Sequence, residues 1–515
     1  MIKLAPLFLL LFFFSCPDAS LAQSPARSDA SLPHAAAVAS AHPLATQAGI
    51  DILKKGGNAF DAAIAVSAVL AVVEPYSSGI GGGGFWLLHN ADSGRDVMLD
   101  GRERAPWRAH RDMYLDDTGN VIAGASITGP LAAGIPGVPA ALDHLARHYG
   151  KLPLSASLAD AIRYAREGFA VDEYYRRMAG FRLDDLRADK TASEIFLNNA
   201  ALPAVGDLIR QPALATTLER LAAQGRAGFY EGATAWDMVR SVRKHGGIWT
   251  MKDLGTYEVK ERDPDVAYYK GMKLTTATLP SSGGLALSEM LNMLSRLEIE
   301  SADRVQQVHR VVEAMRRAYR DRAEYMGDAD YVDVPSDFLV SEAHTLAMLR
   351  TIDRQRATPS SELKQPSPPF SPTGAGADTT HFSIVDKAGN RVSATLSINY
   401  PFGSCFVAGN TGVLLNDEMD DFSAKPGEPN VYGLIGTGAN AIEPGKRMLS
   451  SMSPSFVETR QRVAIVGTPG GSRIITMVLL AVLDFYRGAS AQQMVDLGRY
   501  HHQYLPDKIY YEPDV

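Results

Sequence analysis

The 515-residue sequence is poor in cysteine, in charge of one sign and in long apolar runs. Of its two cysteines, Cys16 falls in a predicted leader, so a mature chain keeps only Cys405 and forms no internal disulfide. The net charge is −7 and basic runs are missing, which argues against nucleic acid or an anionic membrane surface as a partner. With 46% hydrophobic and 21% charged residues, the chain is predicted to be globular, with a large core as the source of its stability.

Local signatures of several catalytic classes are also missing. There is no HExxH motif and no CxxC pair, and the adjacent His501 and His502 are expected to point in different directions on regular structure. We therefore expect no metal site and no cofactor. No GxSxG pentapeptide marks a serine hydrolase of the α/β type, and Cys405, in PFGSCFV, lacks the usual surroundings of a cysteine nucleophile.

The N-terminus has the three parts of a secretory signal peptide. Lys3 precedes an apolar run over residues 4–14, and the small residues Ser20 and Ala22 follow. Cleavage after Ala22 is expected to remove residues 1–22 and to deliver the protein to the periplasm or the exterior.

Two other interpretations of this leader are a membrane anchor and a lipoprotein signal. The apolar run has eleven residues, whereas a spanning helix needs about 20. Lipidation at Cys16 fits poorly because Phe13 and Phe14 precede it. No later stretch is long and apolar enough to cross a bilayer, so no stable membrane span is expected.

The patterning predicts a helix-rich first part and a strand-rich second part, and hence mixed αβ layers. Helices are expected on both sides of Gly56-Gly57-Asn58, and strands on both sides of a turn at residues 92–94. Further helices are expected at 305–327 and 474–486, and further strands at 391–398 and 462–467. Residues 357–378, with five prolines and two glycines, are expected to form a linker.

The sequence changes abruptly from linker to β pattern at Thr379. If the backbone is cut between Asp378 and Thr379, one residue carries both a hydroxyl and a free α-amine, and that amine can act as the base for its own hydroxyl. Such a nucleophile needs no distant histidine. The other interpretation of Thr379 and Thr380 is simply two β-forming residues at the start of a strand.

Longer motifs favour the nucleophile. TTHFSIVDKAGNRVSATLSIN, GVLLNDEMDDFSAKPGEPNVYGLIG, KRMLSSMSP and GTPGGSRIIT, preceded by GNAFDAAIA, SSGIGGGGF, LDGRERAP, LPSSGG and AEYMGD, resemble motifs of the γ-glutamyltranspeptidase family in the expected order. The resemblance covers residue 35 to the end. It implies an α+β fold, the four-layer αββα sandwich of N-terminal-nucleophile hydrolases, which cuts itself into two subunits. These are a large subunit, 23–378 with the linker 357–378, and a small catalytic subunit, 379–515, which form a heterodimer.

The resemblance also implies which residues perform the chemistry. Thr379 matches the residue that cleaves the precursor and then acts as nucleophile. Ser397 stands where the family usually has a threonine that hydrogen-bonds the nucleophile, and serine keeps the hydroxyl while losing the methyl group. Gly470 and Gly471 match the backbone donors of the oxyanion hole. The other interpretation of GTPGGSR, a phosphate-binding loop, lacks both the Walker and the dinucleotide spacing.

The substrate residues are assigned in the same way. Arg102 matches the clamp for the α-carboxylate of the donor, although Arg104 and Arg108 are equally suited by residue type alone. The motif positions select Arg102. Ser450 and Ser451 match the hydroxyl partners of the carboxylate. The residues that accept from the ammonium match Asn399, Glu418 and Asp421. Tyr432 matches the aromatic residue of a lid loop. Without the resemblance, DEMDD is the pattern of a solvated acidic loop.

The implied activity is that of a γ-glutamyltransferase and glutathione hydrolase, whose partners are glutathione and other γ-glutamyl compounds, amino-acid or peptide acceptors, and water. The lid implied by PNVYGLIG separates the chain from cephalosporin-acylase-like members of the family, in which that lid is shortened or missing. Two alternatives remain, a glutaryl acylase of the same fold and an uncleaved, inactive binding protein. Since the family continues for several tens of residues after HHQYLPDKIYYEPDV, a truncated C-terminus is expected.

Overall fold

The computed structural model describes residues 33–363 and 379–513. Two antiparallel sheets dominate it. The first has six strands in the order β1 (Ala37–Ser40), β9 (Thr380–Val385), β10 (Arg391–Ser397), β2 (Gly83–Asn90), β3 (Arg95–Gly101) and β6 (Lys260–Arg262). The second has four, in the order β12 (Val463–Val466), β11 (Ser455–Glu458), β8 (Met272–Thr276) and β7 (Asp265–Tyr269). The predicted signal peptide lies outside the described residues.

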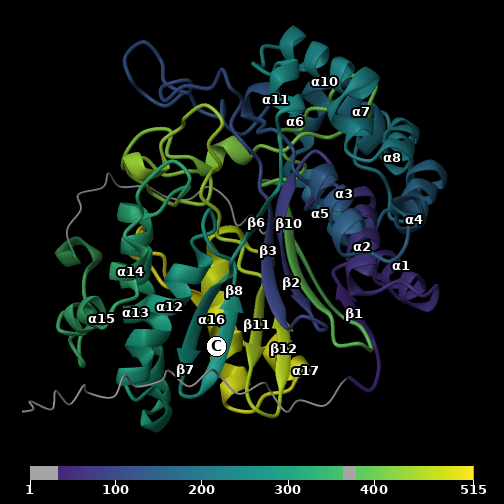
Figure 1. Cartoon of the computed structure of the whole chain (residues 1–515). Helices are drawn as coiled ribbons and strands as arrows, with labels where there is room; N and C mark the ends of the chain where they lie inside the picture. Colours follow the sequence, from purple (N-terminus) through teal and green to yellow (C-terminus); the bar gives the residue numbers. More distant parts are fainter. Residues whose placement is uncertain (1–32, 364–378, 514–515) are drawn as a thin grey trace, which may run out of the picture.

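Helices cover both sides of this pair of sheets (Figure 1). Those in contact with the first sheet are α1 (Pro43–Lys54), α2 (Ala59–Val73) and α3 (Val138–His148), while α4 (Leu154–Glu167) packs on α2 and α8 (Pro212–Gln224) packs on α4. Those in contact with the second are α12 (Gly283–Arg296) and α16 (Ile474–Tyr486), and α13 (Arg304–Tyr325) packs on α12. Smaller helices and strands lie around them: α5 (Glu173–Phe181), α6 (Leu183–Ala188), α7 (Lys190–Phe196), α9 (Ala227–Tyr230), α10 (Gly232–Lys244), α11 (Met251–Gly255), α14 (Ser336–Leu339), α15 (Glu342–Leu349), α17 (Ala491–Asp496), β4 (Phe169–Ala170), β5 (Leu208–Ile209), β13 (Tyr500–His501) and β14 (Tyr510–Tyr511).

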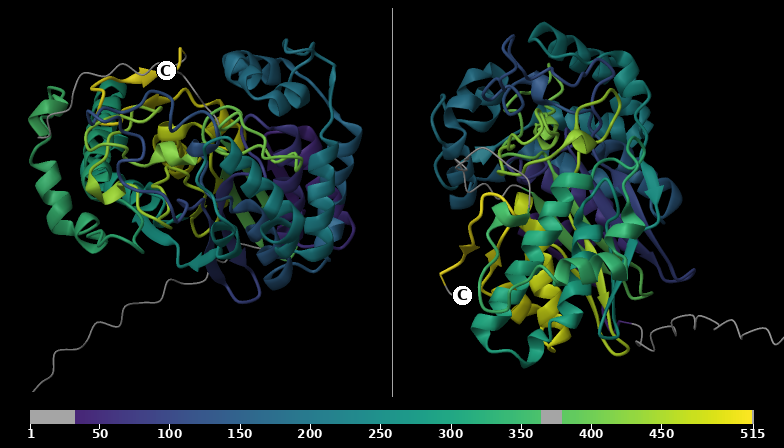
Figure 2. Two further views of the ribbon diagram at one scale, coloured as in Figure 1. Left: turned by 90° about the horizontal axis from the view of Figure 1, so that it is seen from above. Right: turned by 90° about the vertical axis from the view of Figure 1, so that its left-hand side faces the viewer.

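The two faces of the first sheet belong to different cores, as strand alternation requires. Val392, Ala394 and Leu396 on β10 point into the core shared with α2. Ser393, on the opposite face of the same strand, accepts a hydrogen bond from Ser455 N–H of β11 and donates one to the carbonyl of Val466. The sheets therefore contact each other through the face that carries Ser393. The turned views show the purple helices of the N-terminal part and the green helices after residue 330 at opposite sides of the molecule (Figure 2).

Helix α2 is buried around its whole circumference, as its small and apolar sequence predicts. It begins at a capping box, in which Asn58 accepts from the Phe60 and Asp61 amides while the Asp61 carboxylate accepts from the Asn58 amide. Trp86 of β2 is fully buried against it and donates to the Ser67 hydroxyl. This helix forms a rigid backing for the strands that carry the site.

Both sheets combine strands from the two predicted subunits. β9 and β10, from the second part of the chain, lie between β1 and β2 from the first. β10 pairs with β2 over seven residues, from Arg391 opposite His89 to Ser397 opposite Gly83. In the second sheet, β11 pairs with β8. The two parts of the chain therefore share their hydrogen-bonded sheets, and β9, which starts directly after Thr379, is an interior strand.

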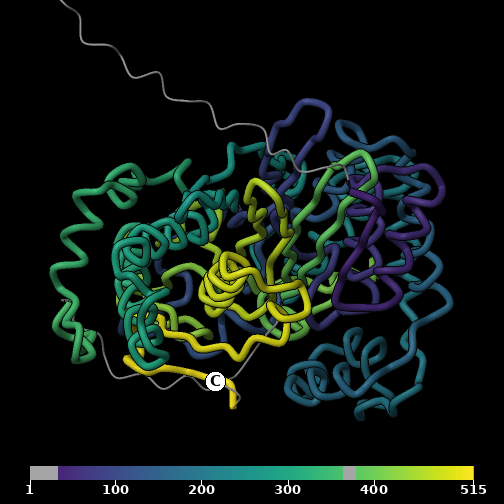
Figure 3. The backbone as a smooth tube through the Cα atoms, turned by 90° about the horizontal axis from the view of Figure 1, so that it is seen from below, coloured from purple at the N-terminus to yellow at the C-terminus, as the bar shows by residue number. Residues whose placement is uncertain are grey.

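The first seven residues of the predicted linker are anchored. Ser360–Leu363 form a short 3-10 helix, and Thr358 and Ser360 are buried. Ser360 receives a hydrogen bond from Arg316 of α13, and it donates one to the carbonyl of Tyr504 in the C-terminal segment. Figure 3 shows this segment in yellow running beside the teal helices. This part of the predicted tether is fixed, while residues 364–378 lie outside the described residues.

Glu74, at the end of the buried helix α2, is a carboxyl group whose titration should change the stability of the protein. It is 4% exposed, and burial raises the pKa of its carboxyl to about 7, while the Thr380 hydroxyl lowers this pKa in part. Between the ordinary pKa of 4.5 and about 7, the folded chain keeps a proton that the unfolded chain releases, so stability falls as pH rises. Above about pH 7 the ionised carboxylate costs about 3 kcal/mol.

We expect Glu74→Gln to remove this dependence, because glutamine does not titrate. The difference in melting temperature between the variant and the parent should grow in favour of the variant from pH 5 to pH 8. Thermal melts over this range measure it, with Glu167→Gln on α4, which removes an exposed carboxylate, as the control. A difference that stays flat with pH contradicts the prediction.

No helix among residues 33–363 and 379–513 combines the length and the apolar character that crossing a membrane requires.

Candidate active site

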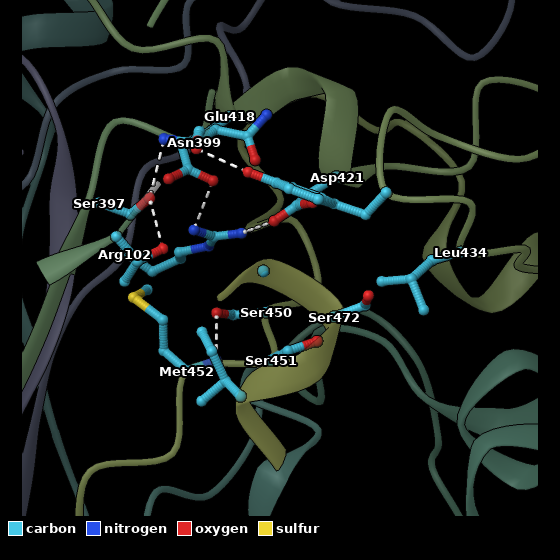
Figure 4. Close-up of a pocket in the computed structure, with 14 residues that line it drawn as sticks. Arg102, Ser397, Asn399, Glu418, Asp421, Leu434, Ser450, Ser451, Met452 and Ser472 are labelled. Atoms are coloured by element: carbon cyan, nitrogen blue, oxygen red, sulfur yellow. Dashed lines mark hydrogen bonds and ion pairs between the residues drawn. The ribbon is translucent and has the colours of Figure 1, made fainter. Parts of the chain in front are cut away.

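A small polar pocket opens where the two sheets and their connecting loops meet, beside the start of β9 (Figure 4). Ten of the eleven residues assigned to the site from the sequence line it: Arg102, Thr379, Ser397, Asn399, Glu418, Asp421, Tyr432, Ser450, Ser451 and Gly471. Gly470 directly precedes the lining residue Gly471. Sequence reasoning missed the lining residues Leu434, Met452, Ser472 and Ile474.

Thr379 lies at the pocket, one residue before β9, and is 5% exposed. Its hydroxyl oxygen is 3.4 Å from that of Ser397, at the end of the neighbouring strand β10. The Ser397 oxygen also accepts a hydrogen bond of 2.8 Å from the Asn399 amide. Adjacent strands thus place two hydroxyls together and orient one of them from the backbone.

The loop after β12 forms another wall. Gly470 and Gly471 have φ angles of 135° and 55°, a region that favours glycine, and the chain then enters a 3-10 turn and helix α16. A Cβ atom on Gly471 would lie 2.6 Å from the Tyr432 ring. Glycine therefore allows the backbone amides of this turn to come close to the pocket, where the start of α16 favours negative charge.

Opposite charges meet inside the pocket. The Arg102 guanidinium, 1% exposed, donates to Glu418 Oε2 at 2.6 Å and to Asp421 Oδ2 at 2.5 Å. Burial raises the pKa of Glu418 to about 7, although the charge of Arg102 opposes this. Figure 4 shows Glu418 and Asp421 on one side of Arg102 and Ser450 and Ser451 on the other. The pocket therefore presents a cation and two carboxyl groups within reach of one small molecule.

The lid loop lies against the pocket. The Tyr432 hydroxyl donates to the Asn399 carbonyl at 2.6 Å, and Gln503 donates to the Tyr432 carbonyl. The Asn430 side chain donates a hydrogen bond of 3.2 Å to Asp421 Oδ1, whereas Arg102 contacts Oδ2 of the same carboxylate. These bonds join the loop that carries Tyr432 to Asn399 and Asp421, and Tyr432 and Leu434 of this loop line the pocket.

The serine pair is held through the backbone and by an arginine that the sequence did not single out. Ser282, before α12, donates its amide and its hydroxyl to the Ser450 carbonyl. Arg322 of α13 donates to the hydroxyls of Ser451 and Ser282. In the sequence Arg322 is one of several arginines on an amphipathic helix, so no local signal distinguishes it.

The rival residues lie elsewhere. Arg104 donates to the carbonyls of Asp253 and Thr256, and Arg108 is exposed, so neither lines the pocket. Cys405 is buried, and burial raises the pKa of its thiol well above the ordinary value, which opposes a thiolate nucleophile. His501 contacts Thr476 and Gln503 while His502 contacts Asp507, so the two rings have different partners.

Comparison with known proteins adds sequence relatives. A family model described as gamma-glutamyltranspeptidase matches residues 45–515. A glutathione hydrolase proenzyme of Pseudomonas sp. (strain A14) is 43% identical over 475 residues, which cover 91% of this chain and 82% of that protein. A glutathione hydrolase proenzyme of Escherichia coli (strain K12) is 42% identical over 480 residues, which cover 92% of this chain and 82% of that protein.

Two solved structures are similar in fold. A cephalosporin acylase from Bacillus halodurans superposes with a TM-score of 0.77 at 29% identity and covers 95% of this chain and 87% of that one. A gamma-glutamyltranspeptidase from Helicobacter pylori superposes with a TM-score of 0.61 at 39% identity and covers 63% of this chain and 94% of that one.

Proposed function

The chain belongs to the γ-glutamyltranspeptidase family, and we propose that Thr379 is its nucleophile and that the charged pocket holds a γ-glutamyl group. It is an enzyme, a γ-glutamyltransferase and glutathione hydrolase. One observation carries the assignment of residues: the hydroxyl of Thr379 opens onto the same pocket as the ion cluster of Arg102, Glu418 and Asp421. The pocket therefore contains both a nucleophile and charged groups that can bind the carboxylate and the ammonium of a free amino-acid end.

The active form of this proposal is a cleaved chain. Self-cleavage between Asp378 and Thr379 yields a large subunit, 23–378, and a small subunit, 379–515, after removal of the signal peptide 1–22. The interleaved strands support a stable heterodimer, because β9 and β10 keep their pairing with β1 and β2 after the cut. The arrangement of helices and sheets supports the four-layer αββα sandwich of N-terminal-nucleophile hydrolases.

Catalysis then proceeds by acyl transfer. The Thr379 oxygen attacks the γ-carbonyl carbon, and its proton passes to the α-amine of the same residue. The backbone amides of Gly470 and Gly471 stabilise the oxyanion. The carbon–nitrogen bond breaks, the amine leaves with the proton, and a γ-glutamyl ester on Thr379 remains. Water releases glutamate from this ester, or the amine of an amino acid or peptide forms a new γ-glutamyl amide, and Thr379 recovers its proton.

Recognition requires the ion cluster to open. Arg102 forms ion pairs with Glu418 and Asp421. A glutamyl group brings a carboxylate and an ammonium, so its carboxylate takes the place of protein carboxylates on Arg102, and its ammonium takes the place of Arg102 beside Glu418 and Asp421. Ser450 and Ser451 complete the carboxylate site, and Asn399 the ammonium site. Because charge is exchanged for like charge, the pocket keeps its balance when it is filled.

A second candidate, a glutaryl acylase, is favoured by the structural similarity to a cephalosporin acylase. A glutaryl group has the carboxylate but lacks the α-ammonium. The Tyr432 lid and the two carboxyl groups beside Arg102 favour the γ-glutamyl substrate.

Asp421→Asn separates these two candidates. We expect kcat/KM for a γ-glutamyl anilide to fall about 100-fold, because a buried charge-assisted contact with the ammonium is lost. Hydrolysis of a glutaryl anilide should change less than about threefold, since this substrate makes no such contact. Steady-state kinetics on both anilides measure the two effects.

Glu428→Gln on the same lid loop is the matched control, because it removes a carboxylate that does not line the pocket. Equal losses on both anilides contradict the assignment of Asp421 to the ammonium. If the parent enzyme prefers the glutaryl anilide, the γ-glutamyl assignment is wrong and the glutaryl acylase is supported.

A further inference from the structure

A second cluster of titratable side chains lies in the helices outside the catalytic pocket. Glu289 of α12, Asp321 of α13 and His344 of α15 each offer one ligand atom, and these atoms lie within 4.8 Å of one another. Figure 1 shows the three helices grouped at one side of the molecule. The residues are too far apart in sequence to form a motif, and the expectation of no metal site rested on local motifs alone.

All three side chains are withdrawn from solvent. Glu289 is 3% exposed, Asp321 is fully buried and His344 is 8% exposed. Neither carboxyl oxygen of Glu289 receives a hydrogen bond from a donor group of the described chain, although both are buried, and burial together with the neighbouring Asp321 carboxyl raises the pKa of Glu289 well above its ordinary value. An unpartnered buried carboxyl group is costly unless something outside the chain satisfies it. The absence of a partner is therefore an observation that points to a ligand.

The other two members are oriented. His344 Nε2 lies 2.7 Å from Asp321 Oδ2, and the His344 ring packs against Phe338 at 4.6 Å between centroids. Asp321 Oδ1 accepts from Arg320 at 2.9 Å and 2.5 Å. One oxygen of Asp321 is thus held by a cation of the protein, and the other faces His344. Such second contacts are what orients metal-ligating carboxylates.

We propose that Glu289, Asp321 and His344 bind one divalent transition-metal ion, zinc by preference. One imidazole nitrogen with two carboxylate oxygens is a donor set that zinc accepts, whereas calcium requires six or more oxygens. Zinc ligands at 2.0–2.1 Å lie about 3.4 Å apart in a tetrahedron, so modest side-chain rotations close the cluster around the ion. The ion replaces protons shared among the three groups, which are released to solvent.

The expected role of the ion is structural. It ties α12, which packs on the second sheet, and its neighbour α13 to the peripheral helix α15. The next residue along α13 is Arg322, which holds Ser451 at the pocket. Reaction at Thr379 needs no metal, so the expected consequence of binding is a more stable helical layer, with a rigid wall behind the serine pair.

Zinc binding to the chelator-treated full-length enzyme tests the proposal. Equilibrium dialysis against zinc chloride with elemental analysis should find one ion per chain. Thermal melts at about 100 times the dissociation constant should show a rise of at least about 3 °C. Glu289→Gln keeps the size of the side chain and should weaken zinc binding at least about 100-fold, with loss of the thermal shift. His344→Gln should also weaken zinc binding and abolish the thermal shift. Agreement between the two variants shows that the loss does not come from misfolding at one position.

Asp265→Asn is the matched control, because Asp265 is another buried carboxyl with an unpartnered oxygen but stands outside the cluster. This variant should bind zinc like the parent. The proposal is overturned if the parent takes up no stoichiometric zinc, or if Glu289→Gln and His344→Gln both bind it with the affinity of the parent. Binding that is lost equally in Asp265→Asn also overturns it, because the ion then lies elsewhere.

Discussion

A Thr379→Ala chain remains in one piece and loses hydrolysis of a γ-glutamyl anilide by at least about 10⁴-fold, the scale of losing a covalent nucleophile. The Thr379 hydroxyl is proposed to cut the precursor and then to attack the donor, and alanine has neither capability. Among the described lining residues, Ser397 has its hydroxyl 3.4 Å from that of Thr379, but it lies on another strand and has no free amine to act as its base. A denaturing gel and an anilide assay measure the two losses.

Thr379→Ser is the matched control. Serine keeps the hydroxyl and the α-amine, so this variant should cleave itself and retain measurable turnover. N-terminal sequencing of the smaller piece of the parent enzyme should read TTHFS, which identifies the scissile bond and the nucleophile together. The assignment fails if purified Thr379→Ala still separates into two pieces. A parent chain that is never cleaved supports instead the inactive binding protein.

Arg102→Met lowers kcat/KM about a thousandfold for γ-glutamyl and glutaryl anilides alike. Both substrates carry the carboxylate that Arg102 is proposed to bind, and the variant leaves Glu418 and Asp421 without their ion-pair partner. Removal of one partner from a buried ion pair costs about 3–5 kcal/mol. The response to both substrates distinguishes this variant from Asp421→Asn, which affects only the γ-glutamyl anilide.

Arg108→Met is the control for Arg102→Met, because Arg108 lies six residues further along the chain, is an equal candidate by residue type, and is exposed outside the pocket. Its activity should stay within about threefold of the parent, as for most exposed substitutions. Self-cleavage of Arg102→Met, followed on a gel, reports whether the variant still folds. An active Arg102→Met enzyme, or an equal loss in Arg108→Met, contradicts the proposed clamp.

Much of the fold follows from local pattern. The helices on both sides of Gly56-Gly57-Asn58, the hairpin about residues 92–94 and the apolar helix α16 lie where the sequence predicts them. Each is encoded by contacts a few residues apart: turn-forming residues, alternation, and helical spacing of apolar side chains. The site residues were located by matching long motifs, and ten of eleven do line one pocket.

Other features depend on packing between distant segments. Arg102 and Glu418 are 316 residues apart, and only the folded chain reveals that the proposed carboxylate clamp and ammonium acceptors form ion pairs with each other. The anchoring of Ser360, the contact of Arg322 with Ser451 and the union of Glu289, Asp321 and His344 have the same origin.

The sequence by itself therefore determined the element types, the abrupt start at Thr379 and the family of the site, because these depend on local spacing and residue type. The tertiary structure decided which charges face each other and which buried groups lack a partner. That distinction has a physical cause. A side chain chooses its rotamer and partner from whatever the packed helices and strands bring beside it, and in this chain those neighbours come from segments tens to hundreds of residues away.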